Sequence, residues 1–149
     1  MKDAIAVGSA AIGQNTDNAT PLQMASVAAT IANHGVRVKP HLAGGKRVKT
    51  RVVSSKVASQ VRQMMIAVVQ YGTGRAAAIP GVQVAGKTGT AELVSTADIA
   101  QDPNNTTAWF VCFAPASNPK VAVAVMLPNA GQGGASAAPI AKRVIQAAL

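Results

Sequence analysis

Residues 108–127 read AWFVCFAPASNPKVAVAVML, two apolar runs on either side of a turn sequence. The runs span 108–114 and 120–127, and their β-branched and aromatic residues favour strands. The segment from Pro115 to Pro119 has the length and composition of a hairpin turn. Because both runs are apolar at nearly every position, we expect a hairpin whose two faces are both covered by other structure.

A third extended segment precedes this hairpin, with an alternating pattern from Val82 through Ala91. Helices are predicted before it and at the end of the chain. The order predicts an α+β fold with three antiparallel strands, helices N-terminal to them and a C-terminal helix packed on the sheet. A chain of 149 residues fits one domain, with a helical part at about 1–75 and the sheet and last helix at about 80–149.

Three helices have recognisable ends. Thr20 to Gln23 has the pattern of a capping box, with proline at the first helical position, and this helix ends at Asn33-His34-Gly35. A second helix begins at Ser54 or Ser55 and ends at Gly72. For the third, 131–134 reads as a loop and Ser136 as the N-cap. The apolar faces are predicted to be formed by Leu22, Ala25, Val27, Ala28, Ile31 and Ala32; by Val57, Val61, Met64, Met65 and Val68; and by Ile140, Val144, Ile145 and Ala148.

Composition excludes several classes of protein. The longest apolar run has seven residues, 121–127, so no transmembrane segment is expected, and the first twelve residues make a poor signal peptide. The single cysteine, Cys112, allows no intrachain disulfide and is expected to be a small buried hydrophobe. One cysteine and two histidines do not predict a structural metal site, and no cofactor is expected.

Charge is concentrated in one region. The formal net charge is +9, and six of the fourteen basic residues lie in 37–51. Glycines interrupt this run, so it is predicted to form a solvated hairpin or loop. No aromatic residue is interleaved for base stacking, so nucleic acid is not an expected partner. The run nevertheless leaves one alternative function open, a non-catalytic basic module that binds an anionic partner. The six residues are Arg37, Lys39, Lys46, Arg47, Lys49 and Arg51.

The segment 81–90, GVQVAGKTGT, matches two unrelated motifs. Residues Gly81 to Thr88 fit the phosphate loop G-x-x-x-x-G-K-[ST]. That loop needs a strand before its first glycine and a helix beginning at the lysine. The alternating Val-Gln-Val-Ala that precedes Gly86 and the Thr-Gly-Thr that follows Lys87 favour a strand instead. A nucleotide-binding function is therefore a minor alternative.

The second motif is Lys-Thr-Gly, residues 87–89, followed by Thr90. On an edge strand, a peptide substrate can add to the free N–H and C=O groups as a further strand, and Gly89 has no side chain to obstruct it. The Lys87 ammonium supplies positive potential for a terminal carboxylate, to which the hydroxyls of Thr88 and Thr90 can donate hydrogen bonds. Lys87, Thr88, Gly89 and Thr90 are the predicted substrate-binding residues.

Four blocks in this order resemble the transpeptidase domain of class B penicillin-binding proteins, most closely the actinobacterial penicillin-binding protein A group. The resemblance extends over essentially the whole chain and implies a partial penicillin-binding/β-lactamase-like fold. It also implies that the backbone N–H of Thr90 forms half of an oxyanion hole. The four blocks are AIGQ at 11–14 with ATPLQMA at 19–25, VAGKTGTAE at 84–92, AWFVCFAP at 108–115 and APIA at 138–141.

The nucleophile that this chemistry needs is not expected in these residues. The full motif set includes Ser-x-x-Lys and a Ser-x-Asn element. Ser-x-Asn does not occur, and Ser-x-x-Lys occurs once, at Ser117 to Lys120 within the predicted turn, where a nucleophile at the start of a buried helix is impossible. The resemblance implies that both elements lie before the position of Met1. The chain then contributes no catalytic residue, is inactive alone and needs the N-terminal half of the domain as its partner.

The resemblance further implies the reaction and its setting. The parent protein is expected to be a peptidoglycan D,D-transpeptidase that cross-links stem peptides through a serine acyl-enzyme. Its partners would be the D-Ala-D-Ala end of the stem peptide and β-lactams. It would act at the extracytoplasmic face of the bacterial plasma membrane.

Overall fold

The computed structural model describes residues 4–13, 17–42, 44–93 and 105–149. Its main sheet has the order β3-β4-β5, with β3 at Ala85–Glu92, β4 at Thr106–Ala114 and β5 at Val121–Leu127. Both pairings are antiparallel. The predicted hairpin and the third strand are therefore confirmed. Within the described residues β4 is the central strand, and the outer edges of β3 and β5 carry no further strand.

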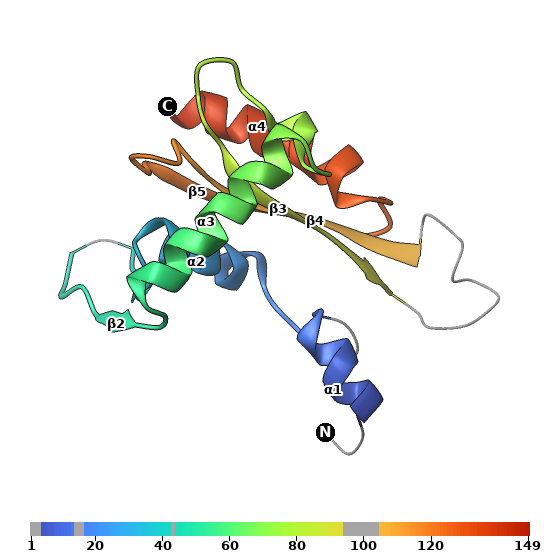
Figure 1. The fold of residues 1–149 in the computed structure, drawn as a ribbon, viewed down its shortest axis with the longest axis horizontal. Helices are drawn as coiled ribbons and strands as arrows, with labels where there is room; N and C mark the ends of the chain where they lie inside the picture. Colours follow the sequence, from blue (N-terminus) through green and yellow to red (C-terminus); the bar gives the residue numbers. More distant parts are fainter. Residues whose placement is uncertain (1–3, 14–16, 43, 94–104) are drawn as a thin grey trace.

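Helices cover both faces of this sheet, as the apolar patterns of β4 and β5 require (Figure 1). Helix α4, at Gly133–Ala148, packs on one face, around a core that contains Phe110 and Ile145. Helices α2, at Pro21–Ala32, and α3, at Ser55–Gln70, cover the other face around Phe113. The two core clusters are thus separated by the central strand, and the α+β layout with a C-terminal helix on the sheet is confirmed.

The start of α2 follows from local chemistry. The side chain of Thr20 accepts a hydrogen bond from the backbone N–H of Gln23, and the Gln23 side chain accepts one from the Thr20 N–H at 2.7 Å. This is the predicted capping box, which satisfies two backbone donors that a helix start leaves unpaired. The helix ends before Gly35, whose φ of 84° lies in the left-handed region that glycine adopts without strain.

The buried faces of α2 and α3 were only partly predicted. Leu22 is 64% exposed and Met64 61% exposed, although the hydrophobic periodicity places both toward the core. Small residues instead make the closest approaches, with Ala28 and Ala58 almost fully buried. Hydrophobic spacing defines a stripe on a helix, but the packing of the helix on the sheet decides which part of that stripe is buried. The other apolar residues predicted to be buried but found exposed are Val27, Val57, Ile140, Val144 and Ala148.

The predicted start of α4 is wrong. The helix begins at Gly133, with Gln132 as its N-cap, so 131–134 is not a loop throughout. Ser136 lies inside the helix and donates its hydroxyl hydrogen to the carbonyl of Ala130. Gly133 and Gly134 favoured the prediction of a loop, because glycine is unfavourable within helices. Here the close approach of the helix to the sheet requires them, because an added Cβ would overlap backbone carbonyl oxygens.

Four shorter elements complete the described chain. Strands β1, at Val36–Val38, and β2, at Lys49–Arg51, form a separate antiparallel ribbon, which confirms the predicted basic hairpin. A 3₁₀ helix, η1, covers Arg75–Ala77, and helix α1, at Ala4–Ala11, projects away from the sheet (Figure 1). None of the helices in the described segments is long and apolar enough to cross a bilayer.

We expect the buried thiol of Cys112 to make stability fall at high pH. The side chain is 0% exposed on β4, and burial raises the pKa of the thiol from 9.0 to about 12. Below pH 9 the thiol is neutral in both states. Above pH 9 it ionises in the unfolded chain but not in the folded one, so the free energy of unfolding falls by up to about 1.4 kcal/mol per pH unit. Urea unfolding at pH 8 and pH 10.5 measures this loss.

The matched variant is Cys112→Ala. It removes the titrating thiol, so its stability should fall less between the two pH values than that of the unmodified chain. An equal fall in both proteins would show that other groups cause the pH dependence.

Candidate functional site

The Lys-Thr-Gly-Thr segment lies on the edge strand β3. Lys87 is opposite Val111 and Thr88 is opposite Phe110 in the register with β4. The strand therefore continues through both motif residues, and no helix begins at Lys87. This geometry excludes the phosphate-loop interpretation of Gly81–Thr88, which requires a turn and a helix start at those positions.

Side chains of the motif lie on both faces of β3. Successive residues of a strand point to opposite faces, so Lys87 and Gly89 share one face while Thr88 and Thr90 share the other. Lys87 and Thr90 are exposed, and Thr88 and Gly89 are half-buried. The Lys87 ammonium donates a hydrogen bond to the carbonyl oxygen of Thr88 at 2.6 Å, which keeps it against its own strand. The Lys87 ammonium and the two threonine hydroxyls therefore lie on opposite faces of the edge strand.

Two hydrogen bonds fix the hydroxyl face. The hydroxyl oxygens of Thr88 and Thr73 are 2.7 Å apart, within hydrogen-bond distance. Thr73, shortly after the end of α3, therefore positions the Thr88 hydroxyl. The backbone N–H of Gly133 donates to the hydroxyl oxygen of Thr90 at 3.4 Å. Gly133 is the first residue of α4, so the positive end of this helix dipole faces the motif. This helix start adds to the favourable potential for an anion at the strand.

Glycine is required at the start of α4 because the helix touches the backbone of the sheet. A Cβ built on Gly133 would overlap the carbonyl oxygens of Trp109 and Gly89. One on Gly134 would overlap the carbonyl oxygen of Thr73. The start of α4, strand β3 and the segment after α3 therefore contact each other through their backbones, without intervening side chains. The start of α4 thus supports the motif strand directly.

A cavity of about 390 Å³ opens along the motif. All four predicted substrate-binding residues line it. Its other walls come from three separate parts of the chain, which the sequence analysis did not connect: the segment between α1 and α2, helix α2 and strand β4. The residues from these walls are Ile12, Gly13, Asp17, Asn18, Ala19, Met24, Trp109 and Val111. The sequence assigned none of them to the site, although six of the eight lie in the resemblance blocks at 11–14, 19–25 and 108–115. Gln14, part of the first resemblance block, lies outside the described residues.

A second cavity, of about 410 Å³, adjoins the first and shares several of its walls. It extends past the motif to Glu92, and Asp17 lines both cavities. The motif cavity therefore has the Asp17 carboxylate as well as the Lys87 ammonium in its walls, and the adjoining cavity adds Glu92. No motif in the sequence predicts a role for Glu92, and only the fold brings Asp17 to the same cavity.

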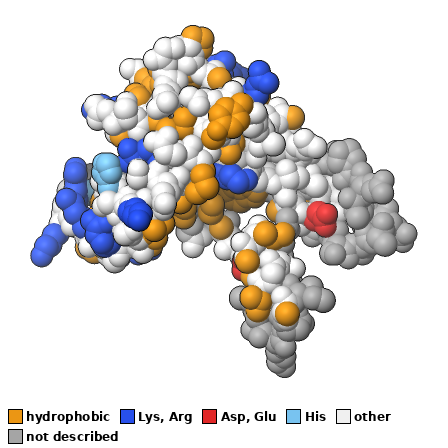
Figure 2. All heavy atoms as spheres, viewed as in Figure 1, with side chains coloured by type: hydrophobic (Ala, Val, Ile, Leu, Met, Phe, Trp, Pro, Cys, Tyr) orange, Lys and Arg blue, Asp and Glu red, His pale blue; other side chains and the backbone are white. Residues whose placement is uncertain are grey.

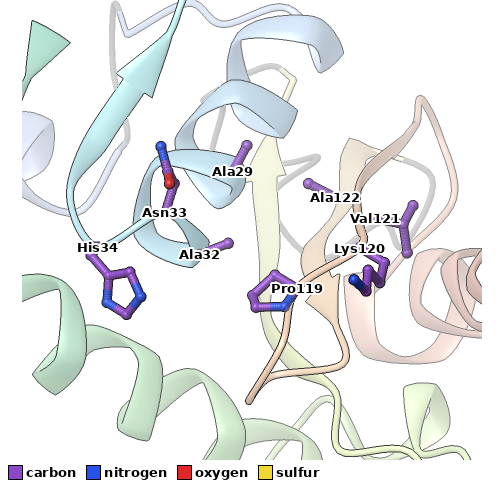
Figure 3. A pocket seen from close by; sticks show the side chains of 8 residues that line it. All are labelled: Ala29, Ala32, Asn33, His34, Pro119, Lys120, Val121 and Ala122. Atoms are coloured by element: carbon purple, nitrogen blue, oxygen red, sulfur yellow. The ribbon is translucent and has the colours of Figure 1, made fainter. Parts of the chain in front are cut away.

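The single Ser-x-x-Lys sequence lies elsewhere. Ser117 is exposed in the bend between β4 and β5, and no helix begins there, as expected. Lys120 lines a different cavity of about 300 Å³, between the end of α2 and the start of β5 (Figure 3). His34, at its rim, lies with its Nδ1 3.3 Å from a guanidinium nitrogen of Arg62. Neither a nucleophile–base pair nor, within the described segments, a metal-binding group of His, Cys, Asp or Glu occurs at this cavity.

Comparisons with known proteins agree with this geometry. Residues 3–146 match the penicillin binding protein transpeptidase domain. The peptidoglycan D,D-transpeptidase PbpA of Mycolicibacterium smegmatis is 43% identical over 99% of this chain and 33% of its own length. The Mycobacterium tuberculosis PbpA is 41% identical over 100% of this chain and 33% of its own length. The chain thus spans about a third of the length of these curated relatives.

Solved structures give the same result. The ceftriaxone acyl-enzyme complex of penicillin-binding protein A from M. tuberculosis superposes with a TM-score of 0.87 at 41% identity, covering 99% of this chain and 36% of the other. The penicillin G acyl-enzyme complex of the same protein gives a TM-score of 0.82 at 40% identity, with 99% and 36% covered. With a domain match over nearly all of its residues, the chain belongs to the penicillin-binding protein transpeptidase family.

Proposed function

We propose that this chain is the C-terminal portion of a peptidoglycan D,D-transpeptidase domain and that it provides the strand on which the substrate carboxylate binds. The observation that carries the proposal is the placement of Lys87, Thr88, Gly89 and Thr90 on an open strand edge along a cavity. The relatives that match over the whole chain are named peptidoglycan D,D-transpeptidases, which supports the reaction class.

The geometry supports a separate role in substrate binding for each group of the motif. A stem peptide ending in D-Ala-D-Ala adds alongside β3 through backbone hydrogen bonds, which the absent side chain of Gly89 permits. Its terminal carboxylate lies near the Lys87 ammonium and the hydroxyls of Thr88 and Thr90, where charge-assisted hydrogen bonds are strong. The dipole of α4 adds to this potential. By family resemblance, the backbone N–H of Thr90 stabilises the oxyanion of the tetrahedral intermediate.

The covalent steps require a serine outside this chain. Its hydroxyl oxygen attacks the carbonyl carbon of the D-Ala-D-Ala peptide bond, and the terminal D-Ala leaves with a proton. The amine of a neighbouring stem peptide then attacks the resulting ester and releases the serine. We therefore assign binding and oxyanion roles, and no nucleophile, to these 149 residues. The reaction would take place at the extracytoplasmic face of the plasma membrane, in line with the peptidoglycan synthesis named for the relatives.

Trapping by benzylpenicillin tests the proposal. A β-lactam mimics D-Ala-D-Ala and remains attached to the serine, so intact-protein mass spectrometry reports acylation. We expect no mass increase for the 149-residue chain alone. We expect acylation in a chimera in which this chain replaces its matching third of the M. smegmatis relative. In the chimera, Lys87→Ala should slow acylation about ten- to a hundredfold, because a lost charge-assisted hydrogen bond costs about 1.5–3 kcal/mol. Thr90→Val should also slow it.

The control is Lys120→Ala, which removes an equal charge outside the motif cavity and should leave the acylation rate unchanged. Acylation of the 149-residue chain by itself, mapped to any serine, would show that the active site is misplaced. Equal acylation rates for Lys87→Ala and Lys120→Ala would show that Lys87 does not bind the carboxylate.

A further inference from the structure

The charges of this chain are separated along its sequence. Residues 18–91 contain ten lysines and arginines and no aspartate or glutamate. Only one of the ten, Lys87, belongs to the motif strand described above. Six of the others are the residues of 37–51 that form and surround the ribbon of β1 and β2. Figure 2 shows Lys and Arg side chains gathered over this ribbon. The transpeptidase site leaves this concentration of charge unexplained.

One arginine of the ribbon has a structural role. A guanidinium nitrogen of Arg51 donates hydrogen bonds to the carbonyl oxygens of His34, at 3.2 Å, and Val53, at 3.3 Å. It therefore ties the ribbon to the end of α2. The others are exposed, and the charged groups of Lys46, Arg47 and Lys49 have no hydrogen-bond partner within the described residues. These five exposed residues, named the basic ribbon, are Arg37, Lys39, Lys46, Arg47 and Lys49.

Charges of the basic ribbon point in more than one direction. Val38 is paired with Lys49, so their side chains share one face, whereas Arg37 pairs with Thr50 on the opposite face. Every residue of β2 is exposed. Alternate residues along a strand are about 7 Å apart, which spaces same-face charges at a regular interval. A flat surface can contact only one face of such a ribbon, whereas a flexible chain can follow both.

We infer that the basic ribbon binds a flexible linear polyanion, a polymer with anionic groups repeated every few ångströms. A lipid bilayer fits less well, because interfacial binding needs an apolar face and only Leu42 and Val48 are exposed large apolar side chains among the described residues of 37–51. Nucleic acid fits less well because no Phe, Tyr or Trp occurs between 36 and 53 to stack on a base. The bound polymer would lie apart from the motif cavity, to which the ribbon contributes no residue.

Fluorescence anisotropy of end-labelled inorganic polyphosphate, measured with the 149-residue chain over a range of salt concentrations, tests the inference. Affinity should fall steeply as salt rises, because binding releases counterions. The triple variant Lys46→Gln, Lys49→Gln and Arg47→Gln should bind about a hundredfold more weakly at 50 mM salt. Its salt slope should be smaller by about 2, at roughly 0.7 per lost contact. Poly-L-glutamate, as a second probe, distinguishes phosphate from carboxylate as the preferred anionic group.

The matched control carries Lys120→Gln, Lys142→Gln and Arg143→Gln, which lower the net charge equally away from the ribbon. This control should bind polyphosphate like the unmodified chain, and circular dichroism verifies that both variants are folded. Equal weakening in the two triple variants would show a response to net charge alone and overturn the inference. So would tighter binding to phosphatidylglycerol vesicles than to either polymer, with the same ribbon dependence. All readouts are of binding, so failure here leaves the transpeptidase proposal untouched.

Discussion

Replacing Gly133 with alanine should lower the free energy of unfolding by about 3 kcal/mol, the upper end of the usual cost of overpacking. The added Cβ would overlap the carbonyl oxygens of Trp109 and Gly89, and neither backbone group can rotate away as a side chain would. The first turn of α4 must then move off the sheet, which also removes the Gly133 N–H from Thr90. Urea unfolding followed by the fluorescence of Trp109, the single tryptophan of the chain, measures the loss.

Gly8→Ala is the matched control for this experiment. Gly8 also lies in a helix, but a Cβ added there meets nothing within 4 Å. This variant should be as stable as the unmodified chain or slightly more stable, because alanine favours helix more than glycine does. If Gly133→Ala were to unfold at the same urea concentration as Gly8→Ala, the close contact between α4 and the sheet would be wrong.

The second large effect is expected for Phe110→Ala, at about 3–5 kcal/mol. Phe110 is 0% exposed at the centre of β4, opposite Thr88 of the motif. Its ring fills the space that two glycines leave, since a Cβ on Gly74 would come within 3.1 Å of Phe110 Cε2 and one on Gly86 within 3.0 Å of Cε1. Removing the ring therefore opens a cavity directly behind β3.

Phe110→Leu retains much of the buried volume and should cost clearly less than Phe110→Ala. Both losses are measured by urea unfolding. In the chimera, Phe110→Ala should also slow acylation by benzylpenicillin, although Phe110 lies outside the cavity lining. Equal stability of the alanine and leucine variants would show that the ring does not fill the core as described.

Local chemistry was predictable from the sequence. The capping box at Thr20 and Gln23 depends on residues three positions apart, and the structure confirms both of its hydrogen bonds. The β-hairpin and the edge position of β3 followed from apolar runs with one turn between them. The four motif residues could be placed on this edge because strand geometry determines where consecutive residues lie.

Long-range contacts were not predictable in the same way. The start of α4 was misplaced because glycine has a low helix propensity, and only the contact with Gly89 shows why Gly133 belongs there. Leu22 and Met64 were placed in the core by a pattern that cannot tell which side of a helix meets the sheet. Asp17 and Trp109 line the cavity through the fold alone, since neither is adjacent to the motif in sequence.

The contact between Gly133 and Gly89 has a consequence for synthesis on the ribosome. The motif at 87–90 emerges first, and the helix start that holds its backbone follows only after β4 and β5 have been made. A transcript with a premature stop codon between the codons for Thr90 and Gly133 still encodes the whole motif. The motif strand of its product lacks the contact with the start of α4. Genome surveys that score penicillin-binding genes by the Lys-Thr-Gly signature alone would therefore count such truncated alleles as intact.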